Sequence, residues 1–332
     1  MNIFLTGGTG FVGGAFLREE GESHLISAMS RSLQSDAHLK LLGAMPVTCS
    51  LENVVAGHMT GAEAVIHCAA YVEEWGPRLD YWRVNVDGTK RLLEAAKRAG
   101  VKRFVHIGTE AALFRGQDMV NVDETYPLAL NSPFPYSRTK AYAEKTVREA
   151  NDPMHGFETI VLRPRFVWGP GDQTLLPVLH RMAKSGQFAW IDGGRNRTST
   201  TYIGNLTYAM DQALTKGKSG QAYFVLDSGG PLVFHDLITR MAHAAGFLLP
   251  EKNVPGGVAR ALAYLTDMAW RVLPLPGKPP LTRFGVNIMS RDCILNDAKA
   301  RAEMGYDPPF TIEYGLRALA AATHEGTYKI VA

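Results

Sequence analysis

A glycine-rich turn close to the N-terminus constrains the fold of this chain more than any other feature. The apolar residues 3–5 predict a short buried strand and residues 11–17 predict a helix, with Gly7 and Gly10 in the turn between them. Gly7 permits the tight turn, Gly10 lets the backbone approach a pyrophosphate, and Gly13 lets the helix pack closely on the strand. The N–H groups and partial positive charge of the helix start favour phosphate. The turn predicts a dinucleotide-binding domain, and glycines that serve turn geometry alone are the alternative.

Strand and helix patterns alternate after this turn. Further strands are expected at residues 25–29, 64–67, 104–107, 159–162 and 222–226, with helices at 81–99 and 136–150. This alternation predicts an α/β fold of the Rossmann kind, a doubly wound parallel sheet covered by helices on both faces. We expect the dinucleotide-binding domain to span residues 1–165, with 201–228 returning to it. A smaller, mostly helical substrate-binding domain is expected to comprise 166–200 and 229–332.

Composition excludes several classes of protein. With 332 residues, 46% of them hydrophobic, the chain can bury a large core. The net charge is only +3 and no basic run is long enough for a nucleic-acid tail. Cys49, Cys68 and Cys293 lie far apart without metal-ligand spacing, a pattern typical of a reducing compartment, and we expect no metal site. Since neither a secretory signal nor an apolar run of about 20 residues is present, we expect a cytoplasmic protein without a transmembrane segment.

The end of the second predicted strand indicates which dinucleotide is preferred. The strand ends in Ser30, Arg31 and Ser32, and no carboxylate stands where one would hold a ribose 2′-hydroxyl. Arg31 offers a planar donor group suited to a 2′-phosphate, and both serines can add hydrogen bonds. The sequence therefore favours NADP(H) over NAD. An ordinary surface arginine at a strand end is the alternative.

Tyr136 and Lys140 form a candidate catalytic pair because they are four residues apart on one helix and share a face. A phenol ionises near pH 10, and a neighbouring ammonium favours its phenolate form. Thr109 follows the strand at 104–107, which places its hydroxyl at the ligand-binding edge of the sheet beside the substrate oxygen. The alternatives are an amphipathic helix with an exposed Tyr and Lys, and a threonine that only caps a turn.

Together these segments resemble the extended short-chain dehydrogenases/reductases, within the NAD-dependent epimerase/dehydratase family. The branch they are most similar to is the 3β-hydroxysteroid dehydrogenase-like one. The likeness covers essentially the whole chain. It rests on six motifs, at residues 6–13 (TGGTGFVG), 67–70 (HCAA), 85–89 (NVDGT), 136–140 (YSRTK), 162–164 (LRP) and 168–172 (WGPGD).

The resemblance implies a role for individual residues. Tyr136 takes the position of the acid/base, Lys140 of the ribose-binding lysine, Thr109 of the family's serine or threonine, and Asn85 of a supporting asparagine. The cofactor contacts it implies, together with those from the glycine turn and strand ends, are Gly7, Gly10, Phe11, Val12, Gly13, Ser30, Arg31, Ser32, Ser50, Leu51, Cys68, Ala69, Ala70, Tyr136, Lys140, Pro164, Phe166 and Val167.

Two departures from the family pattern bear on the site. Thr109 and Glu110 stand where relatives often carry two serines, so Glu110 is expected to line the substrate pocket. Ser50 and Leu51 stand where many relatives have an acidic residue, which removes one adenine contact.

The substrate side carries fewer signals. Arg165, Phe166 and Trp168 leave the sheet at its ligand-binding edge and are expected to wall the cleft, although Phe166 and Trp168 would equally pack the domain junction. The arginines of residues 195–202 would suit a diphosphate or belong to a solvated loop. Apolar residues in 258–284 predict core, a lid over a hydrophobic substrate, or shallow docking to a membrane.

These observations predict an NADP(H)-dependent oxidoreductase that interconverts a ketone and a secondary alcohol on a bulky hydrophobic substrate, steroid-like or β-keto acyl. The alternatives are a nucleotide-sugar epimerase or dehydratase and a non-catalytic dinucleotide-sensing protein. A homodimer is also expected, because relatives dimerise through the helices that correspond to 81–99 and 136–150. The alanines of those helices permit close helix approach, or pack only on the sheet. They are Ala95, Ala96, Ala99, Ala141 and Ala143.

Overall fold

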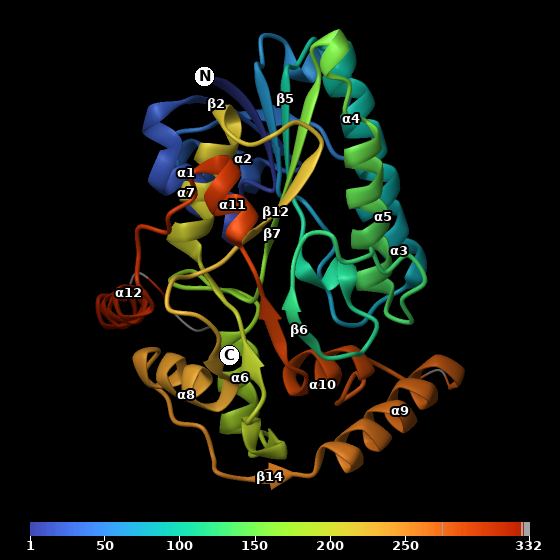
Figure 1. The fold of residues 1–332 in the computed structure, drawn as a ribbon, viewed down its shortest axis with the longest axis vertical. Helices are drawn as coiled ribbons and strands as arrows, with labels where there is room; N and C mark the ends of the chain where they lie inside the picture. Colours follow the sequence, from blue (N-terminus) through green and yellow to red (C-terminus); the bar gives the residue numbers. More distant parts are fainter. Residues whose placement is uncertain (274, 327, 329–332) are drawn as a thin grey trace.

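The computed structural model describes residues 1–273, 275–326 and 328, and its largest element is a seven-stranded sheet (Figure 1). The strand order is β12-β7-β5-β4-β1-β2-β3, and every neighbouring pair is parallel. The doubly wound Rossmann fold is therefore confirmed. The strands are β1 (Asn2–Thr6), β2 (Leu25–Ser30), β3 (Met45–Thr48), β4 (Ala64–His67), β5 (Arg103–Ile107), β7 (Glu158–Pro164) and β12 (Gln221–Val225).

Helices cover both faces of the sheet because successive side chains of each strand point to opposite sides. Ile3 and Leu5 pack on one face with α1 (Phe11–Glu20), α2 (Leu33–Leu41) and α7 (Ile203–Thr215). Phe4 packs on the other face with α4 (Thr89–Arg98) and α5 (Pro135–Glu149). These strands are therefore buried on both sides, as parallel sheets require.

The helix expected at 81–99 is interrupted. It consists of α3 (Arg78–Trp82), a π-helical turn at Arg83–Gly88 and α4. A Cβ on Gly88 would lie 3.0 Å from the Leu51 Cβ, so only glycine lets this turn pack so closely against the segment after β3. Turns of this kind occur often at functional sites.

The alanines named for a dimer contact pack inside the chain. Ala96 and Ala141 are fully buried, and Ala95 and Ala143 are at most 5% exposed. These side chains contact their own subunit, so the dimer expectation keeps only the family resemblance as its support.

A second layer of structure lies below the carboxyl edge of the sheet (Figure 1). It holds a four-stranded sheet of order β13-β10-β15-β6, two two-stranded sheets and most of the C-terminal helices. Its elements are β6 (Met119–Val122), β8 (Val167–Trp168), α6 (Leu176–Lys184), β9 (Trp190–Ile191), β10 (Arg197–Thr198), β11 (Thr201–Tyr202), β13 (Leu232–Val233), α8 (Phe234–Ala244), β14 (Asn253–Val254), α9 (Gly256–Val272), α10 (Arg283–Ser290), β15 (Cys293–Leu295) and α12 (Ile312–His324).

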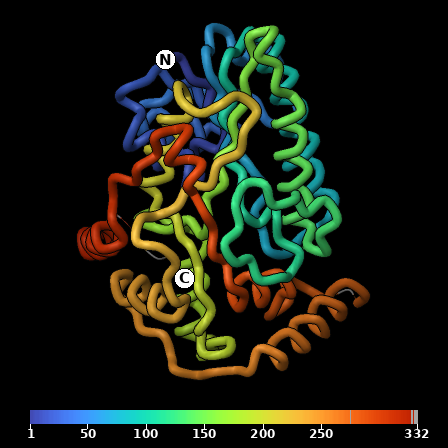
Figure 2. Tube along the Cα trace, viewed as in Figure 1, coloured from blue at the N-terminus to red at the C-terminus, as the bar shows by residue number. Residues whose placement is uncertain are grey.

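Two segments pack in the other layer than the expected domain boundaries predict. β6 lies within residues 1–165 but pairs with β15 of the lower layer, and Figure 2 shows these distant segments side by side. In the opposite direction, α11 (Ala298–Met304) buries Ala300 and Met304 in the core under the main sheet. Residues 274, 327 and 329–332 of the expected second domain lie outside the described residues.

The apolar face of α9 is not core. The helix buries only small or paired side chains, including Ala259 and Ala263, against α10, whereas Leu262 and Leu265 are 46% and 62% exposed. These leucines therefore form neither a core face nor an enclosed lid. Nowhere in the described ranges is a helix long and apolar enough to cross a membrane.

Candidate active site

The glycine turn forms a cradle whose shape depends on missing side chains. Gly7 has φ +75°, and a Cβ there would lie 2.8 Å from the Ala69 backbone nitrogen. A Cβ on Gly13 would lie 2.3 Å from the Gly7 carbonyl oxygen. Helix α1 begins at Phe11 without an acidic residue in its first turn, so its N–H groups face the cradle unopposed. The residues present fit the pyrophosphate of a dinucleotide.

The end of β4 is fastened to this cradle. The Thr6 hydroxyl accepts a hydrogen bond from the Ala69 N–H (3.2 Å) and lies 2.7 Å from Nδ1 of the buried His67. Cys68 and Ala70 flank Ala69 in the same segment, so the motif at 67–70 meets the glycine turn as expected of a cofactor site.

The expected 2′-phosphate contacts are only partly free. The buried Ser30 hydroxyl donates to the Ser32 carbonyl (3.3 Å), and the Ser32 side chain caps α2 by accepting from the Ser35 N–H (3.2 Å). Arg31 is exposed next to them. Of the three residues expected to contact a 2′-phosphate, only Arg31 therefore has its side chain free to do so.

The segment after β3 has its own hydrogen bonds. The Ser50 side chain bonds to Asn53 (3.2 Å), and Leu51 is 9% exposed. Neither side chain offers a charge to an adenosine.

Tyr136 and Lys140 lie one turn apart at the start of α5, which Pro135 initiates. Lys140 is buried, and its Nζ donates to the Ile107 carbonyl at the end of β5 (2.8 Å). Burial lowers the pKa of Lys140 to about 8, while the Glu144 carboxylate acts in the opposite direction. The lysine is therefore held against the strand edge that carries Thr109.

The pKa of Tyr136 is shifted upward. Burial raises it above its ordinary value, the Glu110 carboxylate raises it further, and a hydrogen bond with the Thr109 side chain lowers it. The expected lowering by Lys140 is not found, because the ammonium is directed at the Ile107 carbonyl and does not act on the phenol. Tyr136 is therefore a protonated group at neutral pH in this site, suited to donate a proton.

Thr109 is the first member of a buried polar chain. Its hydroxyl donates to Glu110 (2.8 Å), and Glu110 accepts from the Arg165 guanidinium (2.6 Å). Arg165 is 2% exposed and also donates to the Ile288 carbonyl of α10 (3.3 Å). Glu110 and Arg165, expected to line the substrate pocket, instead pair with each other behind Thr109.

Trp168 also lies away from the cleft surface. Its side chain is fully buried, and Nε1 donates to Asp227 (3.0 Å). Asp227 further accepts from Thr200, from the Tyr202 backbone and from Asn205, which no sequence signal indicated. The Phe166 ring lies 5.8 Å from that of Phe234, and Val167 pairs with Thr201. Phe166 and Trp168 therefore pack the junction between the two layers, which was the alternative to their lining the cleft.

Asn85 connects the loop after β4 to the catalytic helix. In the π-helical turn its side chain accepts from the Tyr71 N–H (2.7 Å) and donates to the Tyr71 carbonyl (3.1 Å) and to the Thr139 hydroxyl (3.2 Å). Asn85 therefore positions the loop at Tyr71 and also Thr139, the neighbour of Lys140 on α5.

An aromatic wall beside Tyr136 was not predicted as part of the site. The Phe284 ring of α10 lies 5.7 Å from the Tyr136 ring and 5.6 Å from the Phe134 ring, each edge to face. Phe134 is buried next to Phe114. Only the position of Phe134, two residues before Tyr136, could have indicated this wall from the sequence. Phe284 lies far away in the chain and reaches Tyr136 through tertiary packing.

The chain matches the family model for the 3-beta hydroxysteroid dehydrogenase/isomerase family over residues 4–255. The chain belongs to this family. It is thus an NAD(P)-dependent short-chain dehydrogenase/reductase, an oxidoreductase that acts on hydroxyl and keto groups, as the motifs predicted.

Relatives that match over nearly the full length of the chain include reductases and dehydrogenases. The chain is 36% identical over 329 residues to a 4-hydroxy-2-methyl-3-oxo-4-farnesyl-3,4-dihydroquinoline-1-oxide ketoreductase of Stigmatella aurantiaca, covering 98% of each protein. It is 33% identical to a 2-alkyl-3-oxoalkanoate reductase of Stenotrophomonas maltophilia (strain K279a), covering 97% of this chain and 99% of the relative. A UDP-glucuronic acid 4-epimerase from Bacillus cereus, solved in complex with NAD, shares the fold (TM-score 0.73, 18% identity, 99% and 100% covered).

Proposed function

We propose that this enzyme interconverts a ketone and a secondary alcohol on a bulky hydrophobic substrate with NADP(H), and that it works as a ketone reductase when NADPH is supplied. The observation that carries the proposal is the placement of the Tyr136 phenol beside Thr109 and one helical turn from Lys140, since a phenol in this position can give its proton to a ketone oxygen. The relatives named as a farnesyl-quinoline ketoreductase and an oxoalkanoate reductase support ketone reduction, and these together with the relatives named as sterol and 3-beta-hydroxysteroid dehydrogenases support an apolar substrate. The wall of Phe284 and Phe134 supplies an apolar surface beside the acid.

Each residue of the site has a separate task in this reaction. Tyr136 donates its proton to the carbonyl oxygen. Thr109 holds that oxygen in place once its hydroxyl turns from Glu110 to the substrate. Bound NADPH supplies the hydride. Lys140, held by the Ile107 carbonyl, is assigned to the ribose of the bound dinucleotide, as the family resemblance implies, and Asn85 positions the surrounding loop. The lower layer of the molecule, including α10, is assigned to substrate binding.

NADPH preference rests on Arg31. The exposed guanidinium follows β2, and no carboxylate stands at the strand end. R31D is expected to lower NADPH affinity by about tenfold to 100-fold, because a charge-assisted phosphate contact contributes about 1.5–3 kcal/mol, while NADH affinity is retained or improved. Equal affinities of the wild-type protein for NADH and NADPH would refute this assignment.

The reaction is tested by following NADPH oxidation with three substrate panels: hydrophobic β-keto esters and acids, 3-ketosteroids, and UDP-sugars. We expect turnover in the first two panels, with specificity constants that rise with apolar size. Because epimerisation and dehydration consume no net NADPH, the UDP-sugar panel is also analysed for isomerised or dehydrated products. Such products without ketone turnover would replace ketone reduction by the epimerase or dehydratase reaction. Dinucleotide binding without turnover in any panel would favour the sensing alternative.

A homodimer is proposed on the family resemblance alone. Light scattering at micromolar concentration is expected to give about twice the 36.3 kDa mass of the chain. A mass of one chain would reject the dimer.

A further inference from the structure

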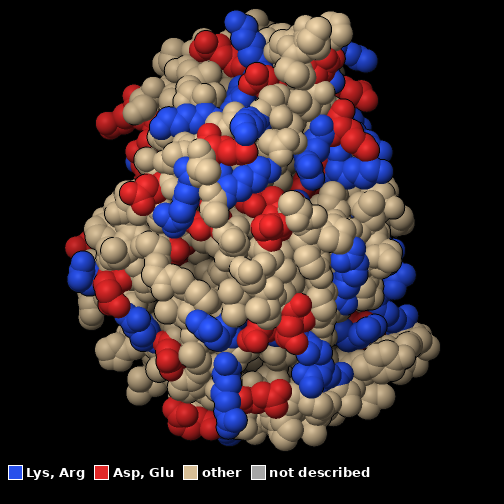
Figure 3. Space-filling model, in the orientation of Figure 1, with Lys and Arg blue, Asp and Glu red and all other residues tan. Residues whose placement is uncertain are grey.

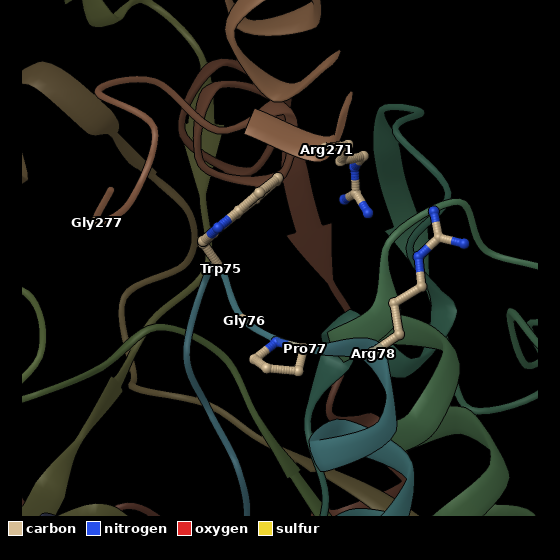
Figure 4. A pocket seen from close by; sticks show the side chains of 6 residues that line it. All are labelled: Trp75, Gly76, Pro77, Arg78, Arg271 and Gly277. Atoms are coloured by element: carbon tan, nitrogen blue, oxygen red, sulfur yellow. The ribbon is translucent and has the colours of Figure 1, made fainter. Parts of the chain in front are cut away.

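A groove lined by arginines lies between the loop after β4 and helix α9. It comprises a cavity of about 630 Å³, lined by Trp75, Gly76, Pro77, Arg78, Arg271 and Gly277 (Figure 4), and a smaller one of about 140 Å³. Both cavities are lined by Arg78 and Arg271, and the smaller adds Arg283. Three cationic side chains from different elements thus border one space.

The positive charge of this groove is poorly compensated. Arg271 donates to Asp267 (2.8 Å) and its guanidinium lies 4.7 Å from the centre of the Trp75 ring. Arg283 lies over the Tyr264 ring (5.2 Å). Within the described ranges, neither Arg78 nor Arg283 forms an ion pair, and Asp267 is the only acid among the residues that line the two cavities. Like charges gathered in this way favour a bound anion.

Acidic residues close to the groove are already paired. Glu73 forms an ion pair with Lys278, and Glu74 contacts the Thr282 hydroxyl (3.3 Å). These contacts join the loop to the segment between α9 and α10 without neutralising Arg78 or Arg283.

The groove borders the catalytic residues through shared neighbours. Arg283 precedes Phe284, whose ring contacts Tyr136, and the small cavity is also lined by Pro133, three residues before Tyr136. The loop that carries Trp75 leads into Arg78, the first residue of α3, and it contains Tyr71, which Asn85 fixes. The groove and the Tyr136 ring therefore share two neighbours, helix α10 and the segment that leads into α5.

We propose that this groove binds the anionic head group of an amphiphilic substrate, a carboxylate or a phosphate, while its apolar part extends toward Tyr136. The half-exposed Tyr264 and Met268 border the guanidinium groups, so the groove offers charge and apolar surface together. The proposal rests on the ketone-reductase function and adds the head-group chemistry to it.

The test compares wild-type protein with R78Q/R283Q, which removes the two unpaired guanidinium groups and leaves the Arg271–Asp267 pair intact. R98Q, on the exposed C-terminal turn of α4, is the matched control. Calorimetric titration with decanoate, methyl decanoate and inorganic phosphate measures binding. Steady-state kinetics with 3-oxodecanoate and its methyl ester measures the effect on turnover.

We expect decanoate to bind about tenfold or more tightly than methyl decanoate, and R78Q/R283Q to remove that difference. The KM for 3-oxodecanoate should rise by a similar factor at unchanged kcat, with the methyl ester unaffected and R98Q like wild type. Equal binding of decanoate and its ester, or an unchanged KM in R78Q/R283Q, would overturn the proposal. Arginine-dependent decanoate binding without ketone turnover would retain the anion site and reject the ketone-reductase function.

The exposed face of α9 makes a lipid headgroup the competing source of the anion. Leu265, Met268 and Val272 lie on this uncharged face, and Figure 3 shows a mostly tan strip there beside basic residues. Arginine-dependent binding to phosphatidylglycerol vesicles, with decanoate and 3-oxodecanoate unaffected by R78Q/R283Q, would assign the groove to a lipid and overturn the substrate proposal.

Discussion

Substituting Gly13 by alanine should disable dinucleotide binding through one methyl group. The Cβ would lie 2.3 Å from the Gly7 oxygen, 2.8 Å from the Gly7 carbonyl carbon and 3.0 Å from the Gly8 Cα. These are backbone atoms, so the cradle itself must move. Overpacking of this kind costs about 1–3 kcal/mol. The same displacement misplaces the N–H groups that face the pyrophosphate, so NADPH affinity should fall by at least about tenfold.

Gly14 provides the matched control on the same helix. A Cβ there would approach Gly8 oxygen to 3.4 Å, an ordinary contact, and alanine favours a helix by up to about 1 kcal/mol over glycine. Calorimetric titration with NADPH and thermal unfolding of G13A and G14A measure both effects. G14A should bind like wild type and unfold at the same or a higher temperature. If G13A also binds like wild type, the close packing of the cradle is not what holds the cofactor.

Two further predictions concern buried charges. In E110Q, Arg165 loses its buried partner, so urea titration should show a decrease of about 3–5 kcal/mol in the free energy of unfolding. R240Q, from an exposed pair with Glu313, should change it by less than about 1 kcal/mol, and equal effects would contradict a buried pair. Lys140, whose pKa falls from 10.5 to about 8 on folding, binds fewer protons when folded between these pH values. Stability of the wild type relative to K140M should therefore rise with pH across that window, and a constant or falling difference would refute the shift.

The sequence predicted the features that local patterns determine. Alternating apolar runs and helices predicted the positions of six of the seven strands of the main sheet, all but β3, because period and turn residues are local properties. The positions of Gly7, Gly13, Tyr136 and Lys140 were equally predictable, since each is set by spacing within one turn or one helix.

Residues whose role depends on a distant partner were not predictable in this way. Glu110 and Arg165 were expected to face substrate, but they are 55 positions apart in the chain and pair only once β5 and β7 lie side by side. The same holds for Phe284, which reaches Tyr136 from α10. For α9 the apolar pattern allowed core, a lid or shallow membrane docking, and the helix packs along one narrow side through alanines, which leaves its leucines exposed.

The most direct test of the central claim is the rate of ketone reduction by Y136F. The substitution keeps the ring that packs on Phe284 and removes only the proton donor. Reduction of the best hydrophobic ketone, measured with saturating NADPH, should fall by about 10²–10⁴-fold while NADPH affinity stays within about twofold of wild type. Activity close to that of the wild type, with the cofactor bound normally, would show that Tyr136 is not the acid.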